Sequence, residues 1–242
     1  METERKCIYC SKMANTEDEI PSRNLFPTGI GPKKYIKVPS CKECNQSFSL
    51  DEEWFRYFVC GLAEPYSLYA RQVFFSQVKR SILKRPQIGF KLKKRMKLTE
   101  VHTKSGLYLG KATLVRPKKD DWQRFCNVLD KYIEGLVFYE LKNILPSEYN
   151  IEHDIFLTKD RVSNIAPRIK GFKWKIVNKD IFRYGFNFVP GSHKSVWITV
   201  FYNSVSCESL VFKAEDIKYF GNPDKQKKQG QNFVNLDSGN LM

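Results

Sequence analysis

The stretch Ile36-Lys-Val-Pro-Ser-Cys41-Lys-Glu-Cys44-Asn45 decides how the first fifty residues fold. A second pair of the same spacing, Cys7-Ile-Tyr-Cys10, precedes it by 30 residues. Each Cys-x-x-Cys pair is typical of a knuckle, in which two thiolates point at one ion, and two knuckles complete a tetrahedral site. Soft thiolate ligands in a closed shell favour Zn²⁺ as a structural ion. The sequence therefore predicts one structural zinc held by Cys7, Cys10, Cys41 and Cys44.

Two other interpretations of these cysteines remain open at this point. The pairs are either unrelated free thiols or one of them is a redox dithiol, although two pairs would then compete for that role. The other three cysteines, Cys60, Cys126 and Cys207, fall in apolar patterns and are expected to act as small buried hydrophobic residues.

Length and composition limit the class of protein. The chain has 242 residues, of which 42% are hydrophobic, so it contains enough apolar side chains for a packed core and is not wholly disordered. No apolar stretch of about 20 residues predicts a membrane span. The first residues, Met-Glu-Thr-Glu-Arg-Lys, lack the apolar core of a signal peptide. These features predict a soluble, cytoplasmic protein.

Positive charge is concentrated in one segment. The whole chain carries a formal charge of +15, and residues 79–119 alone hold 14 Lys or Arg against the single acidic residue Glu100. Such a field attracts a polyanion, and nucleic acid, DNA in particular, is the predicted partner. A solvated basic face is the alternative. The residues expected to contact phosphates are Lys91, Lys93, Lys94, Arg95 and Lys97. Aromatic residues beside them, such as Phe75, Phe90 and Tyr108, are expected to lie in the core rather than to stack on bases.

The pattern of apolar residues predicts an α+β fold. Residues 1–50 are loop-rich and need a staple to hold one shape. Helices are expected from about residue 49 to Pro65, over 67–83, and from Pro117 to about Pro146. Strands are expected over 89–101, 107–115, 151–157, 172–177, 182–189, 195–202 and 208–212. The predicted organisation is a zinc-binding module at 1–60, a basic α+β domain at 61–220 with a mostly antiparallel sheet, and a polar tail at 221–242.

A family resemblance rests on residues around the two knuckles. Thr16-Glu-Asp18-Glu19-Ile-Pro21 lies between them, and Val38-Pro-Ser-Cys41-Lys-Glu-Cys44-Asn45 contains the second. Together with the following helix start, this stretch resembles the zinc-braced branch of the HNH (ββα-metal) endonuclease superfamily. The resemblance is strong over about residues 5–56 and weaker beyond. It implies an N-terminal ββα unit and, if the site is active, hydrolysis of DNA phosphodiesters with Mg²⁺ or a similar divalent ion.

The resemblance also assigns candidate catalytic residues. Asp18 falls on the hairpin position that binds the catalytic ion, and Asn45 falls on the last position of the signature. Glu19 occupies the position of the general-base histidine. A glutamate carboxylate is a weaker base than imidazole by about two pKa units, and general-base assistance is worth about 10²- to 10⁴-fold in rate. The alternative for these acidic residues is an ordinary acidic turn.

Three functions follow as hypotheses. The first is an HNH-type metal-dependent endonuclease, or a close relative, that is weakly active. The second is a catalytically silent descendant that keeps the zinc fold as a nucleic-acid or protein binding module. The third, an RNA-directed binder without nuclease ancestry, fits the charge but not the motif.

Overall fold

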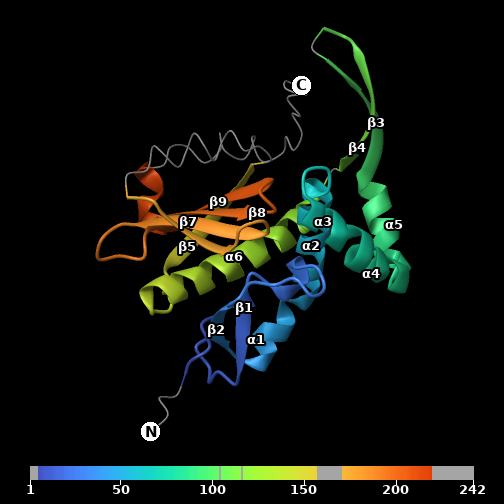
Figure 1. Cartoon of the computed structure of the whole chain (residues 1–242). Helices are drawn as coiled ribbons and strands as arrows, with labels where there is room; N and C mark the ends of the chain where they lie inside the picture. Colours follow the sequence, from blue (N-terminus) through green and yellow to red (C-terminus); the bar gives the residue numbers. More distant parts are fainter. Residues whose placement is uncertain (1–4, 104, 116, 157–170, 220–242) are drawn as a thin grey trace.

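The computed structural model describes residues 5–103, 105–115, 117–156 and 171–219. Within them the chain has the α+β fold that the sequence predicts, with helices and a five-stranded antiparallel sheet. The N-terminal hairpin and this sheet lie on opposite sides of the long helix α6 (Lys119–Leu141), as Figure 1 shows. The tail expected at residues 221–242 lies outside the described residues.

The N-terminal unit has the order strand, strand, helix. Strands β1 (Thr16–Ile20) and β2 (Ile36–Ser40) pair antiparallel, and the short helix α1 (Lys42–Ser47) follows. Alternate residues of the strands are buried, because successive side chains of a strand point to opposite faces. The buried face lies against α6, where Gly135 leaves room for the side chain of Ile20.

The helices that follow differ in detail from the prediction. Helix α2 (Ser49–Ala63) agrees with it, and carboxylates in its first turn complement the helix dipole. The helix expected over 67–83 consists of α3 (Leu68–Val73), the π-helical segment η2 (Phe74–Val78) and α4 (Lys79–Lys84). Helix α6 ends at Leu141, before the expected Pro146, because Lys142 adopts a left-handed backbone conformation with φ of 57°.

The strand expected over 89–101 is wrong for its first half. Residues Pro86–Arg95 form helix α5, and only Met96–His102 form strand β3, which pairs with β4 (Tyr108–Val115). Ile88 and Leu92 are four residues apart, so a helix places both on one face. There they pack against a small cluster that contains Trp54 of α2. Tertiary packing therefore overrides the approximate alternation of apolar and basic residues.

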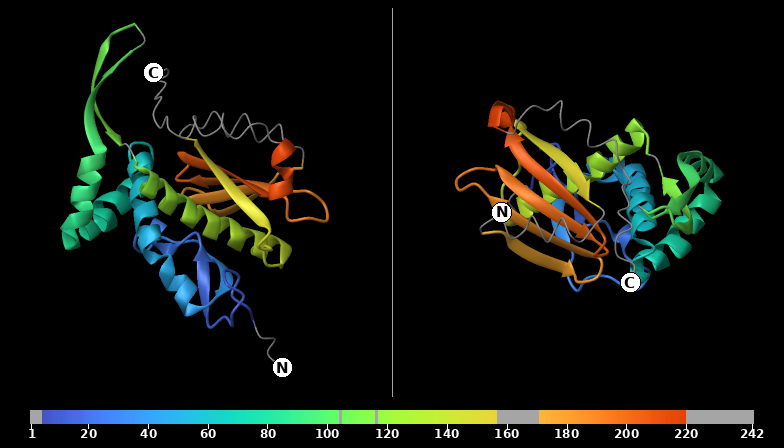
Figure 2. Two further views of the ribbon diagram at one scale, coloured as in Figure 1. Left: turned by 180° about the vertical axis from the view of Figure 1, so that it is seen from behind. Right: turned by 90° about the horizontal axis from the view of Figure 1, so that it is seen from above.

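Helices α4 and α5 and the hairpin β3–β4, residues 79–115, form an arm. Figures 1 and 2 show the arm on the side of α2 and extending away from the five-stranded sheet. Contacts of the Trp54 cluster attach the base of the arm to α2.

The sheet has the strand order β5-β9-β8-β7-β6 with antiparallel neighbours throughout. The predicted strands are confirmed in position, and the last begins three residues before the expected Glu208. Their bounds are β5 (Tyr149–Phe156), β6 (Lys173–Asn178), β7 (Phe182–Phe188), β8 (Ser195–Phe201) and β9 (Val205–Lys213). Turns at 189–192 and 202–204 join β7 to β8 and β8 to β9. The short helices η1 (Arg23–Leu25) and η4 (Ala214–Tyr219) complete the described elements.

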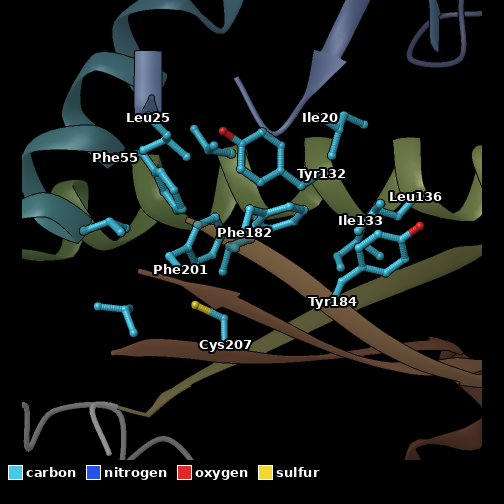
Figure 3. Close-up of a cluster of buried hydrophobic side chains, with 14 of the residues drawn as sticks. Ile20, Leu25, Phe55, Tyr132, Ile133, Leu136, Phe182, Tyr184, Phe201 and Cys207 are labelled. Atoms are coloured by element: carbon cyan, nitrogen blue, oxygen red, sulfur yellow. The ribbon is translucent and has the colours of Figure 1, made fainter. Parts of the chain in front are cut away.

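One hydrophobic core joins the hairpin, α2, α6 and the sheet. Figure 3 shows Phe55 of α2, Tyr132 of α6, and Phe182 and Phe201 of the sheet in one aromatic group. The same core includes Ile20 of the hairpin. Because this core crosses residue 60, the N-terminal unit packs as part of the larger body. The division into domains at that point stays a prediction.

None of the helices in the described part of the chain combines the length and the apolar character that a membrane crossing requires.

Candidate functional site

The four cysteines of the two knuckles form one cluster. Their sulfur atoms all lie within 4.8 Å of one another, and Cys10 and Cys41 Sγ are 3.7 Å apart. Tetrahedral Zn–S bonds of about 2.3 Å separate neighbouring sulfurs by about 3.8 Å. The cluster therefore fits a structural metal ion such as Zn²⁺, as the sequence predicts.

Local structure positions each pair of thiols. The backbone N–H of Cys7 donates to Lys12 O at 2.7 Å, which closes the first knuckle. Cys41 is the N-cap of α1, and its sulfur accepts from the backbone N–H of Cys44 at 3.4 Å. The backbone N–H of Cys44 lowers the pKa of the Cys41 thiol, but burial and the neighbouring Glu43 and Cys10 outweigh it and raise this pKa above its usual value.

The thiols of the cluster differ in acidity. Burial opposes ionisation of Cys7, but backbone N–H groups, first that of Cys41, outweigh it and lower the pKa of this thiol to about 7. Burial and the neighbouring thiols raise the pKa of Cys44 well above its usual value. The arrangement thus accepts one negative charge readily and needs a bound cation to ionise fully.

Asp18 lies on the buried face of strand β1 and is paired with a lysine of α6. Its Oδ2 accepts from Lys131 Nζ at 2.9 Å and from the Tyr9 hydroxyl at 2.9 Å. Its Oδ1 accepts from the backbone N–H of Glu19 at 2.8 Å. The side chains of Asp18 and Lys131 are only 7% and 1% exposed.

The ammonium of Lys131 is shared between two carboxylates. It also contacts Glu52 Oε1 and lies 5.2 Å from the centre of the Phe48 ring. Glu52 in turn accepts from the Ser22 hydroxyl. Sequence reasoning missed Lys131 and Glu52. A signal for Lys131 was available, since it lies three residues after Val128 on the apolar face of the predicted helix.

Glu19 faces away from Asp18. Both are on β1, where consecutive side chains point to opposite faces. The Glu19 carboxylate is held in a two-point ion pair by Nε and a terminal nitrogen of Arg23. The guanidinium of Arg23 also lies 5.2 Å from the centre of the Tyr35 ring.

Asn45 ties helix α1 to strand β1. Its Nδ2 donates to Glu17 O at 3.2 Å and, more weakly, to Thr16 Oγ1 at 3.5 Å.

Among the described residues, the four cysteines form the one group of three or more Cys, His, Asp or Glu side chains close enough to share an ion. The catalytic roles of Asp18, Glu19 and Asn45 stay predictions.

The predicted phosphate contacts lie on the arm, but one of them has another partner. Lys91, Lys93, Lys94 and Lys97 are exposed. Arg95 forms a two-point ion pair with Asp121 of α6, with one of the two contacts at 2.9 Å, and its side chain is 13% exposed. Arg95 therefore holds the arm against α6.

Several aromatic residues near these lysines are exposed, contrary to the expectation that they belong to the core. Phe75, Phe90 and Tyr108 have 58%, 66% and 50% of their surface exposed. They offer apolar rings beside positive charge.

The remaining cysteines and histidines lie apart from the metal-binding cluster. Cys60 and Cys207 are fully buried, as predicted, and Cys126 is half-buried. His153 has hydrogen-bond partners at both ring nitrogens, Asp130 and Ser209, each at 2.8 Å. The side chain of His153 is buried and its hydrogen bonds are satisfied.

Comparison of the chain with protein families, curated proteins and solved structures finds no match.

Proposed function

We propose that this protein binds nucleic acid, DNA in particular, through the arm, and that its zinc-braced ββα unit is a catalytically silent scaffold. The observation that carries the proposal is the set of exposed lysines on α5 and β3, Lys91, Lys93, Lys94 and Lys97. Lysines that neutralise phosphates release condensed counterions, so they bind a polyanion without reading its sequence. The exposed rings of Phe90 and Tyr108 on the same arm favour contact with unpaired bases.

The silent state is supported by the partners of the candidate catalytic residues. The charge of Asp18, which a catalytic cation would need, is already neutralised by Lys131. An ammonium next to a carboxylate also repels a divalent ion. Glu19, in the position of the general base, is bound by Arg23. The residues around Asp18 therefore do not fit Mg²⁺, and no hydrolytic step is assigned to them.

Binding is tested by fluorescence anisotropy of a labelled DNA, both as a single strand and as a duplex, over a series of salt concentrations. The variant in which Lys91, Lys93, Lys94 and Lys97 are all changed to Gln should bind more weakly at low salt. Its slope of log K against log salt should be shallower by about 3 to 4, because each phosphate contact contributes about 0.9.

A charge-matched variant is the control. Lys34, Lys173, Lys175 and Lys179 are exposed and lie outside the arm, so changing all four to Gln should leave the slope near that of the wild type. Equal losses in both variants would overturn the assignment to the arm. The same measurement with RNA of the same sequence separates the two nucleic acids.

The proposed absence of nuclease activity is tested by plasmid cleavage with Mg²⁺ or Mn²⁺. Wild-type protein should not cleave, and Glu19→His together with Lys131→Met should be needed before cleavage appears. Wild-type cleavage that Asp18→Ala abolishes would instead establish the active endonuclease.

A further inference from the structure

A basic cleft separates the loop after β1 from the helices at the base of the arm. Its volume is about 670 Å³, within the range of small-molecule sites. One wall is formed by residues of the loop 23–31 together with Tyr35, and the other by α2, η2 and α4. Five of the lining residues are basic, and no Asp or Glu lines it: the basic ones are Arg23, Arg56, Arg80, Lys84 and Arg85.

Arg56 is the buried cation of this cleft. It is only 9% exposed, and its Nε has no hydrogen-bond partner among the described residues. Its terminal nitrogens have distant partners, Gln77 Oε1 at 3.5 Å and Glu53 Oε1 at 3.9 Å. A buried guanidinium donor without a good acceptor is costly unless a ligand supplies one. An anionic oxygen in the cleft would satisfy Arg56.

The other cations leave an excess of positive charge. Arg23 and Arg85 form ion pairs with Glu19 and Glu53, which lie outside the lining. Arg80 and Lys84 are exposed on α4, and neither forms an ion pair with a described residue. Arg80 and Lys84 are therefore available, with Arg56, to neutralise a group that carries about two negative charges.

The cleft also offers contacts beyond charge. Asn24 lines it, and the Oδ1 atom of Asn24 is a buried acceptor without a described partner. Phe26 and Tyr35 form an edge-to-face aromatic pair in the same wall, with ring centres 5.6 Å apart. A ligand that has an anion, an N–H or O–H donor and a flat ring matches this set, and a nucleotide has all three.

We propose that the cleft binds the terminal phosphate of a nucleic-acid strand. Arg56, Arg80 and Lys84 hold the phosphomonoester, and the terminal nucleotide lies along Tyr35. A terminal phosphate carries up to two charges, whereas an internal phosphodiester carries one, so the three cations favour the strand end. Because Arg80 and Lys84 belong to the arm, a strand bound along the arm reaches the cleft. This inference deepens the proposed function and rests on it.

The test compares oligonucleotides of one sequence that carry a 5′-phosphate, a 3′-phosphate or only hydroxyl ends. One phosphorylated form should bind the wild-type protein about tenfold more tightly than the unphosphorylated form. The variant Arg80→Gln/Lys84→Gln, which changes exposed side chains, should lose this preference while keeping its fold by circular dichroism. Arg56→Gln should lose it too.

A matched control keeps the charge change but moves it out of the cleft. Lys79→Gln/Lys91→Gln alters two exposed residues of the arm that do not line the cleft, and should bind all forms more weakly while retaining the preference. Equal binding of all three forms overturns the inference and leaves the proposed function standing. If the wild-type protein bound none of the three forms, the proposed function itself would be overturned. A free mononucleotide that binds as tightly as the oligonucleotide would make the cleft a nucleotide site and overturn the strand-end assignment.

Discussion

Lys131 Nζ lies 2.9 Å from Asp18 Oδ2, and the two side chains are almost fully buried. This pair joins helix α6 to the hairpin that carries Asp18. The position that the HNH resemblance assigns to a metal ligand is thus held by a cation from within the chain. The pair therefore contributes to the stability of the fold, and it also decides whether Asp18 is available to bind a catalytic ion.

Removing the ammonium should destabilise the protein. Lys131→Met leaves the Asp18 and Glu52 carboxylates buried without a counter-charge, which costs on the order of 3 kcal/mol. Urea denaturation should show this loss, and the added change Asp18→Asn should recover part of it. Lys119→Met, at the exposed start of the same helix, is the control. Equal stability of Lys131→Met and Lys119→Met would contradict the prediction.

Loss of the metal should affect more than the first fifty residues. Elemental analysis should find one zinc per chain, and Cys41→Ser should release it. Ile20 and Val38 of the hairpin belong to the shared core, so removal of zinc by a chelator should lower the melting temperature of the whole protein. Cys60→Ser, which changes a cysteine outside the cluster, should retain zinc. Wild-type protein that contains no zinc would disprove the metal site.

Lowering the pH should weaken the contact between helix α2 and the arm, because it protonates Glu53. Burial opposes ionisation of this carboxyl, but hydrogen bonds from Ser81 and Tyr57 and the charge of Arg85 outweigh it and lower its pKa. A lowered pKa stabilises the fold at a pH above the unfolded value of about 4.3, and this contribution disappears as the pH falls through the folded value.

The variant Glu53→Gln should therefore be less stable than wild type at pH 7, and the difference should shrink below about pH 4. Urea denaturation over a pH series measures it, with Glu215→Gln, a change of an exposed residue in helix η4, as control. A difference that is constant over the whole pH range would argue against an ionised Glu53.

Neighbouring basic residues of the arm should respond differently to substitution. Arg95→Ala breaks the buried pair with Asp121 and should lower stability by about 3 kcal/mol. Lys94→Ala changes an exposed side chain and should leave stability within about 0.5 kcal/mol while weakening DNA binding. Thermal denaturation and anisotropy on both variants check this. The opposite pattern would place Arg95, and not Lys94, on the binding surface.

Gly135 should resist substitution although it lies inside a helix. A Cβ there would collide with Cδ1 of Ile20 and lie 3.2 Å from its Cγ1. Alanine usually stabilises a helix by about 1 kcal/mol relative to glycine, but the collision should make Gly135→Ala less stable by about 1 to 3 kcal/mol. Ile20→Val removes Cδ1, so the double variant should melt above Gly135→Ala alone. If Gly135→Ala were instead more stable than the wild type, the hairpin would have to shift at little cost to make room for the added Cβ.

The sequence by itself determined the elements whose signals are local. The spacing of Cys7, Cys10, Cys41 and Cys44 identified the cluster, because ligand type and turn geometry are encoded within a few residues. Periodicity also identified α2, α6 and the strands of the sheet, whose apolar faces match their own repeat. The helix Pro86–Arg95 was missed because its face is defined by Trp54, which lies far away in the chain.

The tertiary structure alone decided the surroundings of the candidate site. Lys131 and Asp18 are far apart in sequence, and nothing near either residue predicts their contact. The partner of Glu19 and the cleft around Arg56 likewise depend on how the loop after β1 packs against the helices. Charge pairing and buried polar atoms depend on distance in space, and only packing fixes that distance.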